Sequence, residues 1–502
     1  MIQLGRDIRS DATLDCDLVV VGTGAGGAMV ARQAARAGLK VIALEEGAHL
    51  GPRDFTQRED EMLPLLFQDG GGRTTDDGAI TVLQGRGVGG STVHNTNLCK
   101  RAPAAVLDGW RLDGWRAGEL APHYEVVERD LSVAPIDESR VNRNNAILRR
   151  GVEKLGWKGG ILSHNRVGCV GSGFCELGCA FDAKQNALKV LIPAAVGAGA
   201  RVIADCRAER VLVKHGRAIG VQARALDNGA GGTGRPGATV TVRARAVCLA
   251  GSAVGSAVLA QKSGLPDPSG RAGKGLHLHP GAAVAGVFDE IIEGWNGIPQ
   301  SWECTEKLRF DDAPDNDDRT WIITAFAHPI GLASSLPGFG AAHMKLMRLY
   351  PRIAVLAAML HDRSEGSVSV SGGRPVVKYA LDGGDVRALV RGMAACAEIL
   401  FAAGARQVIV PYSDPLVLTS VGELGRIAAR GYRPLAPLLT AVHPMGTLAL
   451  GRVVDERGSW RGADGVWVAD GSLFPTSLGG PPQLSIYAAG HKVAGHIVEA
   501  MR

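Results

Sequence analysis

Three glycines and one carboxylate near the start of the chain have the types and the spacing that a dinucleotide site needs. Gly22, Gly24 and Gly27 form a Gly-x-Gly-x-x-Gly run after an apolar strand, and Glu45 ends the next apolar segment. Such a turn brings backbone amides, and the positive end of the helix expected over 28–38, to a pyrophosphate. The carboxylate then accepts hydrogen bonds from ribose hydroxyls. Because strand, turn, helix and acid agree, the sequence predicts a dinucleotide-binding unit rather than an ordinary glycine-rich loop.

A second glycine-rich run lies at 83–95 and carries hydroxyl, imidazole and amide side chains. Its polar and glycine positions that could contact a ligand are Gly89, Gly90, Ser91, His94 and Asn95. Glycines let a backbone approach a large planar ligand closely, and the polar side chains suit a ligand with polar edges. This run therefore favours a dinucleotide that has a large planar ring system with polar edges.

Three cysteines, Cys169, Cys175 and Cys179, have the spacing of an iron–sulfur site. A ferredoxin-type run is Cys-x2-Cys-x2-Cys-x3-Cys, and here Ser172 stands in the second position. Three thiolates with one ligand lost suit a 3Fe-4S cluster, which would pass electrons to an external acceptor. Two alternatives stay open: a loop with three reduced thiols, and a zinc site completed by His164.

The second glycine run and three C-terminal stretches resemble the glucose-methanol-choline (GMC) oxidoreductases, a family of FAD enzymes. The C-terminal stretches are 443–447, which reads His-Pro-Met-Gly-Thr, 466–476 and 482–486. The motifs stand in family order and span most of the chain. The residues that the resemblance and the N-terminal turn assign to FAD are Gly22, Gly24, Gly27, Glu45, Gly89, Gly90, Ser91, His94, Asn95, Val211, Asp470, Gly471, Pro482 and Gln483.

The resemblance also implies that His443 is the catalytic base. A neutral imidazole can take the hydroxyl proton of an alcohol while the flavin receives the hydride. The chain departs from the family at Pro481, where members usually place Asn or His in a Gly-x-Asn-Pro pattern. Proline offers no side-chain donor. Either His443 works alone, a water or a histidine of the substrate domain substitutes, or the reaction is not ordinary alcohol oxidation.

His94 holds the position that carries the flavin covalently in choline oxidase-like members of the family. A bond from this histidine to the C8 methyl group would retain the cofactor and raise its potential. The alternative is a histidine that packs or hydrogen-bonds beside the xylene edge of a noncovalent flavin.

Composition points to a large enzyme that does not bind nucleic acid. The chain has 502 residues, 46% of them hydrophobic, and a net charge of +5 without basic runs. Nucleic acid is therefore not expected as a partner. No apolar stretch reaches the length of a membrane span and the N-terminus does not resemble a leader, so we expect a cytoplasmic protein. Cys206, Cys248 and Cys396 stand in apolar surroundings and are expected to be reduced core thiols.

The expected fold class is α/β, with a discontinuous Rossmann-like FAD-binding domain and a substrate domain whose sheet roofs the flavin. The expected ranges are 12–110, 183–274 and 436–502 for the FAD-binding domain, 111–182 for a connecting segment with the cysteine loop, and 275–435 for the substrate domain. The apolar and basic segment 331–360 has two interpretations: packing in the core or cap of the protein, or a membrane-surface helix interrupted by Pro and Gly.

The expected substrate is a small-molecule alcohol, and its identity is a hypothesis. The acidic run at 311–318 could attract a cation, and the chain is similar in size and family to sugar dehydrogenases that oxidise the 6' alcohol of amino sugars in aminoglycoside pathways. A solvated loop is the alternative interpretation of this run. Two other activities stay open: a long-chain or other alcohol oxidase that uses oxygen, and a lyase without net redox chemistry, for which Pro481 is the argument.

Overall fold

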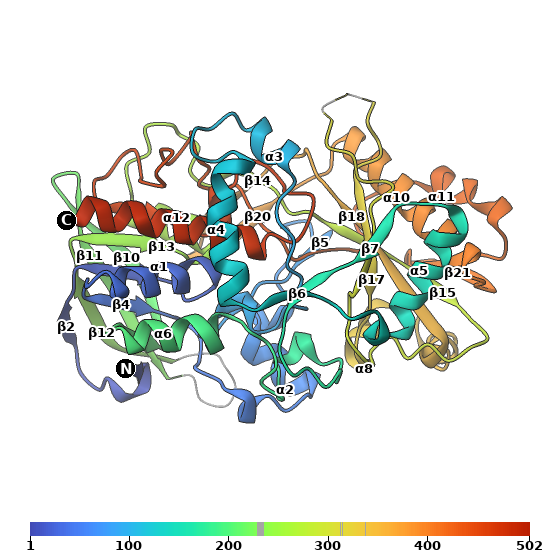
Figure 1. The fold of residues 1–502 in the computed structure, drawn as a ribbon, viewed down its shortest axis with the longest axis horizontal. Coiled ribbons are helices and arrows are strands. Elements are labelled where there is room, and N and C mark those ends of the chain that lie inside the picture. Colours follow the sequence, from blue (N-terminus) through green and yellow to red (C-terminus); the bar gives the residue numbers. More distant parts are fainter. Residues whose placement is uncertain (228–234, 312, 314, 337) are drawn as a thin grey trace.

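The computed structural model describes residues 1–227, 235–311, 313, 315–336 and 338–502. Figure 1 shows two parts: a parallel sheet with helices α1 (Ala25–Arg36) and α12 (Gln483–Met501), and a larger sheet with helices α5 (Arg143–Leu155) and α10 (Gly383–Ala402). The expected α/β fold class is confirmed.

The first part is built on a six-stranded sheet in which all neighbours run parallel. Its central strands are apolar runs because helices cover the sheet, and Leu18, Val19 and Val20 are fully buried. In spatial order the strands are β1 (Ile2–Leu4), β9 (Arg201–Ala204), β4 (Val41–Leu44), β3 (Leu18–Val21), β13 (Ala246–Leu249) and β24 (Val466–Val468).

Helix α1 begins at Ala25, three residues before the expected start. Gly24 is its N-cap and carries no side chain, so the helix begins directly after the glycine turn. The helix ends at Arg36, before Gly38, whose φ of +90° lies outside the helical region. Helix α12 packs on α1 and on α4 (Ala117–Asp130), which joins the C-terminus to the N-terminal unit.

The second part is a nine-stranded, mainly antiparallel sheet. In addition to strands from 275–435, the expected substrate domain, it takes β5, β7 and β23 from outside that range; the domain boundaries stay predictions. Helices α5 and α10 pack on it. Its strands are β22 (Leu416–Leu418), β21 (Gln407–Val410), β15 (Gly281–Val287), β18 (Ile353–Leu360), β17 (Thr320–Ala325), β16 (Trp302–Cys304), β7 (Gly159–Ile161), β23 (Leu439–Ala441) and β5 (Ile80–Val82).

Three smaller sheets complete the fold. They are β10 (Cys206–Lys214), β11 (Arg217–Asp227), β12 (Arg235–Arg243) and β2 (Ala12–Asp15); β14 (Lys274–Leu276), β19 (Gly366–Ser371) and β20 (Arg374–Lys378); and β6 (Val133–Pro135) with β8 (Ser163–Asn165). The glycine-rich stretch 228–234 between β11 and β12 lies outside the described residues. The remaining helices are α2 (Glu59–Leu66), α3 (Ala104–Gly109), α6 (Ile192–Gly197), α7 (Ser252–Ser263), α8 (Pro329–Ser335), α9 (Gly340–Met347) and α11 (Gly425–Arg430).

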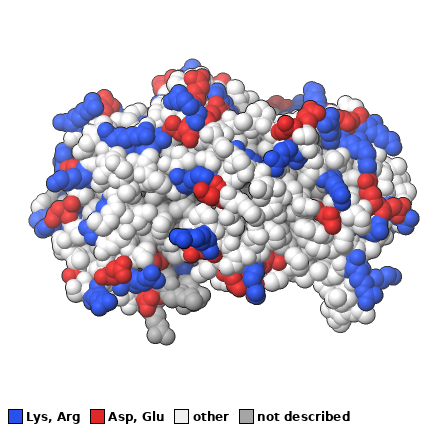
Figure 2. Space-filling view, turned by 60° about the horizontal axis from the view of Figure 1, so that its bottom comes forward, with Lys and Arg blue, Asp and Glu red and all other residues white. Residues whose placement is uncertain are grey.

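The segment 331–360 is not one surface helix. It contains the last residues of α8, all of α9 and strand β18, which is paired on both sides within the large sheet. Pro337, one of the expected interruptions, lies outside the described residues. In the described part of the chain, none of the helices is long and apolar enough to cross a membrane. Figure 2 shows acidic and basic side chains interspersed over one face, without a continuous basic patch.

The cysteines expected to be core thiols are free and buried. Cys206, Cys248 and Cys396 lie in the core, and none of the nine cysteines forms a disulfide. The cytoplasmic location stays a prediction.

Candidate active site

The glycine turn between β3 and α1 depends on backbone approaches that a side chain would block. Gly22 has a φ of +100°, and a Cβ there would lie 2.3 Å from the carbonyl oxygen of Ala250. A Cβ on Gly27 would lie 2.0 Å from the carbonyl oxygen of Gly22. The space at Gly24 is open, and the nearest atom to its Cβ would be the Cα of Gly90 at 4.0 Å. The first and second glycine runs therefore meet at the N-terminus of α1.

Glu45 and Thr23 join these two runs. The Glu45 carboxylate accepts hydrogen bonds from the Thr23 hydroxyl at 2.8 Å and from the amides of Gly47 at 3.0 Å and Gly87 at 3.2 Å. The Thr23 hydroxyl accepts a bond from the amide of Gly89 at 3.1 Å. Burial raises the pKa of the Glu45 carboxyl to about 7. Sequence reasoning missed Thr23, although a hydroxyl between two glycines of the turn was the available signal.

The C-terminal motif residues lie at the same helix end. Gly26 packs so tightly that a Cβ there would lie 1.6 Å from the carbonyl oxygen of Ala469. The carboxylate of Asp470 accepts bonds from the Ser256 hydroxyl at 2.5 Å and the Ser472 amide at 2.9 Å. The chain thus carries Asp470 and the following Gly471 to the N-terminus of α1, and their role in binding FAD stays a prediction.

The start of α12 contacts the second glycine run. Gln483, the first residue of the helix after Pro482, accepts a hydrogen bond from the side-chain amide of Asn95 and donates to the carbonyl oxygen of Leu98 at 3.1 Å. Ser91 accepts a bond from the amide of Gly85 at 2.8 Å.

Val211 is the predicted FAD residue that the structure does not bring to this group. Its amide donates to Ser263 at the end of α7, whereas the start of the same helix lies beside the glycine turn. A helix of 12 residues separates its two ends by roughly 18 Å. The role of Val211 stays a prediction.

His443 lies beside this group and faces a second histidine. Two residues further on, Met445 exchanges backbone hydrogen bonds with His277, and the Gly446 amide donates to the carbonyl oxygen of Gly471 at 3.2 Å. The Nδ1 atoms of His443 and His279 are 2.8 Å apart. Burial, and then His279, lower the pKa of His443 well below its ordinary value, so the ring is a neutral imidazole that can accept a proton.

A buried carboxylate organises the histidines around His443. The Asp362 carboxylate accepts bonds from the amides of Leu278 and His279, at 3.0 Å each, and from the Tyr379 hydroxyl at 2.6 Å. Burial lowers and Asp362 raises the pKa of His277, with a net upward shift. Sequence reasoning missed Asp362, because no local motif marks it.

The loop that contains the Pro481 departure packs on two aromatic rings of this region. A Cβ on Gly479 would lie 2.5 Å from the ring of Phe310 and 3.3 Å from that of His361. Removal of the ring from water lowers the pKa of His361 to about 3. The region near His443 therefore contains several neutral imidazoles and one anionic carboxylate.

His94 is a buried histidine with a free ring nitrogen. Its ring lies against Phe67 with centroids 4.0 Å apart. Burial and then Lys184 lower its pKa to about 3, and its Nε2 has no hydrogen-bond partner among the residues that the structure describes.

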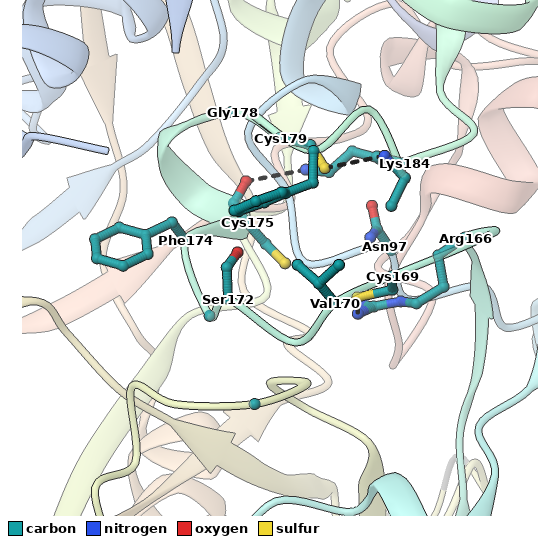
Figure 3. Close-up of a pocket in the computed structure, with 14 residues that line it drawn as sticks. Asn97, Arg166, Cys169, Val170, Ser172, Phe174, Cys175, Gly178, Cys179 and Lys184 are labelled. Carbon is teal, nitrogen blue, oxygen red and sulfur yellow. Dashed lines mark hydrogen bonds between the residues drawn. The ribbon is translucent and has the colours of Figure 1, made fainter. Parts of the chain in front are cut away.

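The three motif cysteines line one small cavity of about 20 Å³ (Figure 3). Arg166 and Lys184 line it too, so two cationic side chains face the thiols. Burial raises the pKa of the Cys175 thiol, and Arg166 and Lys184 oppose that shift. Lys184 also ties this cavity to the second glycine run, because its ammonium donates to the carbonyl oxygens of Cys175 at 3.0 Å and Val93 at 2.8 Å.

The zinc alternative is not supported. The two ring nitrogens of His164 are engaged by Arg166 and by the carbonyl oxygen of Gln300. In the ranges that the structure describes, no group of three His, Cys, Asp or Glu side chains is arranged to hold a metal ion. The three thiols are of the kind and number that a 3Fe-4S cluster needs, and the cluster stays a prediction.

Comparison with known proteins finds similarity over most of the chain. Family profiles described as GMC oxidoreductase match residues 63–281 and 362–490, and one described as NAD(P)-binding Rossmann-like domain matches 20–90. A GMC-type oxidoreductase of Mycobacterium tuberculosis, Rv0492c, is 36% identical, with 97% of this chain and 77% of that protein covered.

Two more distant relatives have activities in their names. Long-chain-alcohol oxidase FAO3 of Arabidopsis thaliana is 29% identical, with 99% of this chain and 69% of the relative covered. Paromamine 6'-oxidase of Streptomyces fradiae is 28% identical, with 98% and 94% covered. Among solved structures, pyridoxine 4-oxidase from Mesorbium loti has a TM-score of 0.71 at 16% identity over 96% of this chain and 99% of that one, which shows a shared fold.

Proposed function

The chain belongs to the GMC oxidoreductase family, and on that premise we propose that it binds FAD and oxidises the CH–OH group of an alcohol. The observation that carries the proposal is that His443, a neutral histidine linked through Gly446 to Gly471, lies beside the group of predicted FAD residues. FAD, when bound, supplies the hydride acceptor.

One set of residues would hold FAD, and His443 would deprotonate the alcohol. The open space at Gly24, the uncapped N-terminus of α1 and the Glu45 carboxylate suit the pyrophosphate and ribose of FAD. His443 takes the hydroxyl proton of the alcohol, so that the C–H bond can release its electron pair as hydride.

The test is flavin reduction under anaerobic conditions. Wild type, His443→Ala and the control His215→Asn, an exposed turn residue, are mixed with a panel of primary alcohols, and flavin bleaching is followed. Because general base catalysis supplies about 100-fold or more, His443→Ala should bleach at least about that much more slowly while it keeps its FAD. Equal rates in all three proteins would place the base elsewhere.

Two classes of alcohol compete as substrate. Trp321, buried and stacked near His279, belongs to an apolar cluster with Ile323 and Met359, which favours an apolar alcohol. The amino-sugar hypothesis has support from the paromamine 6'-oxidase relative. The acidic run supports it less, because Asp317 and Asp318 are paired with arginines of α10; Asp312 lies outside the described residues. A panel that contains 1-dodecanol and paromamine separates the classes.

Covalent attachment through His94 is the second part of the proposal. The support is a buried, neutral imidazole whose Nε2 is free among the described residues, since a bond to the C8 methyl group needs an unprotonated nitrogen. After acid precipitation, the flavin colour should stay with wild-type protein and leave His94→Ala. Colour released from both proteins would refute covalency.

A 3Fe-4S cluster held by Cys169, Cys175 and Cys179 is the third part. The support is that the three cysteines share one cavity and that Arg166 and Lys184 line it too. In addition, the Lys184 ammonium donates to the carbonyl oxygen of Val93, the residue before His94. A cluster there would supply a one-electron carrier, and the protein would then be a dehydrogenase that uses an external acceptor and reacts poorly with oxygen.

Iron and sulfide analysis with low-temperature electron paramagnetic resonance tests the cluster. Anaerobically purified wild type and Cys16→Ser, a cysteine outside the loop, should contain both elements, and Cys175→Ser should lose them. An active anaerobic preparation without iron would leave the three cysteines as thiols and favour the oxidase.

A further inference from the structure

His279 packs on His443 near the point where strands β15 and β23 of the large sheet pair. The Nδ1 atoms of the two rings are 2.8 Å apart, and the rings stack with centroids 5.0 Å apart at 22°. The His279 ring also stacks near Trp321, at 6.4 Å between centroids, and His279 is fully buried.

The backbone of His279 is held in an unusual conformation. Its φ is +50°, in the left-handed region that non-glycine residues rarely adopt, and Pro280 follows. The Asp362 carboxylate accepts hydrogen bonds from the amides of Leu278 and His279 and so fixes this conformation. Strained backbone of this kind persists where the surrounding structure over-determines it, and it gathers at functional sites.

A hydrogen bond over this distance needs one proton between the two Nδ1 atoms, and the nitrogen that carries it decides what His443 can do. A neutral imidazole has one N–H and one acceptor nitrogen. If His443 is to accept a proton at Nε2, its own proton must be on Nδ1 and point to His279. His279 then accepts at Nδ1 and has its proton on Nε2, which is buried without a partner among the described residues.

We propose that His279 is a positioning residue that accepts the Nδ1 proton of His443 and thereby keeps Nε2 of His443 free to act as base. This rests on the proposed function. When the alcohol O–H bond breaks, its proton forms the N–H bond at Nε2, and the hydride goes to the flavin. His443 is then a cation, and its bond to neutral His279 becomes charge-assisted.

The surroundings of the pair agree with this assignment. Asp362 is the anionic neighbour, and the titratable side chains around it include His277, His361 and Tyr379. The Asp362 carboxylate keeps a pKa below its usual range, so a negative charge lies behind the pair at neutral pH. Pro481 offers no hydrogen-bonding side chain at the position where the family places its second residue, so the histidine partner of His443 in this chain comes from another element.

Two variants separate positioning from packing. His279→Asn keeps an acceptor oxygen where Nδ1 stood, and His279→Leu keeps volume without an acceptor. We expect flavin reduction about 10- to 100-fold slower in His279→Leu, because a wrongly oriented or wrongly protonated base is ineffective, with substantial recovery in His279→Asn. In a His443→Ala background, His279→Leu should add less than about twofold, since residues that act as a unit are not additive.

Nitrogen NMR of protein labelled with ¹⁵N-histidine gives a readout that does not depend on turnover. The His443 signal, assigned by its loss in His443→Ala, should show the Nδ1–H tautomer in wild type and His279→Asn, and lose that preference in His279→Leu. A wild-type His443 with its proton on Nε2, or an equal loss from His279→Leu in both backgrounds, would overturn the proposal. If no alcohol reduces the wild-type flavin, the proposed function fails while the NMR result still tests the positioning.

Discussion

Glu45 is a buried carboxyl group, and burial disfavours its ionised form. Burial raises its pKa to about 7, and its hydrogen bonds to Thr23 and Gly47 oppose that shift without cancelling it. The protein without FAD therefore holds Glu45 protonated in about half of its molecules near neutral pH. A ligand that donates hydrogen bonds to the ionised form must release that proton when it binds.

FAD affinity should consequently depend on pH. Ribose hydroxyls favour the carboxylate, so FAD lowers the pKa of Glu45 and binds more tightly as pH rises through about 7. Between pH 6 and 8 the dissociation constant should fall about tenfold, as one proton is released. Titration of apoprotein by flavin fluorescence measures it. Glu45→Gln is the control and should show no such dependence; the same slope in both proteins would assign the proton to another group.

The residues that could be predicted from the sequence lie in short local motifs, whereas the residues around His443 depend on contacts between distant parts of the chain. Glu45, the glycines and the cysteines belong to short motifs whose spacing reflects local geometry, so they could be predicted. The partner of His443 is His279, which is 164 residues away in the chain. Their contact follows from how β15 and β23 pair in the large sheet, and no local pattern contains that pairing.

At the scale of elements, the turn before α1 sets how closely this helix approaches the parallel sheet. Strand β3, helix α1 and strand β4 were predicted because apolar runs and a glycine turn alternate in a familiar order. The large sheet was predicted only in outline. Its strand β7 comes from the segment expected to be a connection, and its strands β5 and β23 come from ranges expected in the FAD-binding domain.

Two glycine-to-alanine changes in helices should have opposite effects. A Cβ on Gly27 would lie 2.0 Å from the carbonyl oxygen of Gly22, so Gly27→Ala should push α1 from the turn and cost about 1–3 kcal/mol of stability with loss of FAD. A Cβ on Gly255 in α7 would meet no described atom within 4 Å, so Gly255→Ala should stabilise by about 0.5–1 kcal/mol. Denaturant unfolding and flavin content measure both; a neutral Gly27→Ala would contradict the close approach.

At the scale of the whole molecule, most of the residues predicted to bind FAD come from three distant parts of the chain. The glycine run at 22–27, the run at 89–95 and the stretch 470–483 meet at one end of α1. A ligand that spans all three stabilises contacts between the N-terminal and C-terminal regions. A ligand that contacts only the glycine run at 22–27 does not stabilise these contacts.

Thermal unfolding with three ligands should therefore separate FAD from a nicotinamide cofactor. FAD at a hundredfold excess over its dissociation constant should stabilise apoprotein by about 2.7 kcal/mol. ADP and NAD share only the half that Gly22, Gly24 and Glu45 hold, so at equal concentration both should give smaller shifts of similar size. His94→Ala is the suitable protein, because its FAD can be removed even if wild type holds FAD covalently. A shift by NAD as large as that by FAD would mean that the residues at 89–95 and 470–483 do not bind the flavin half, and the assignment of FAD would fall.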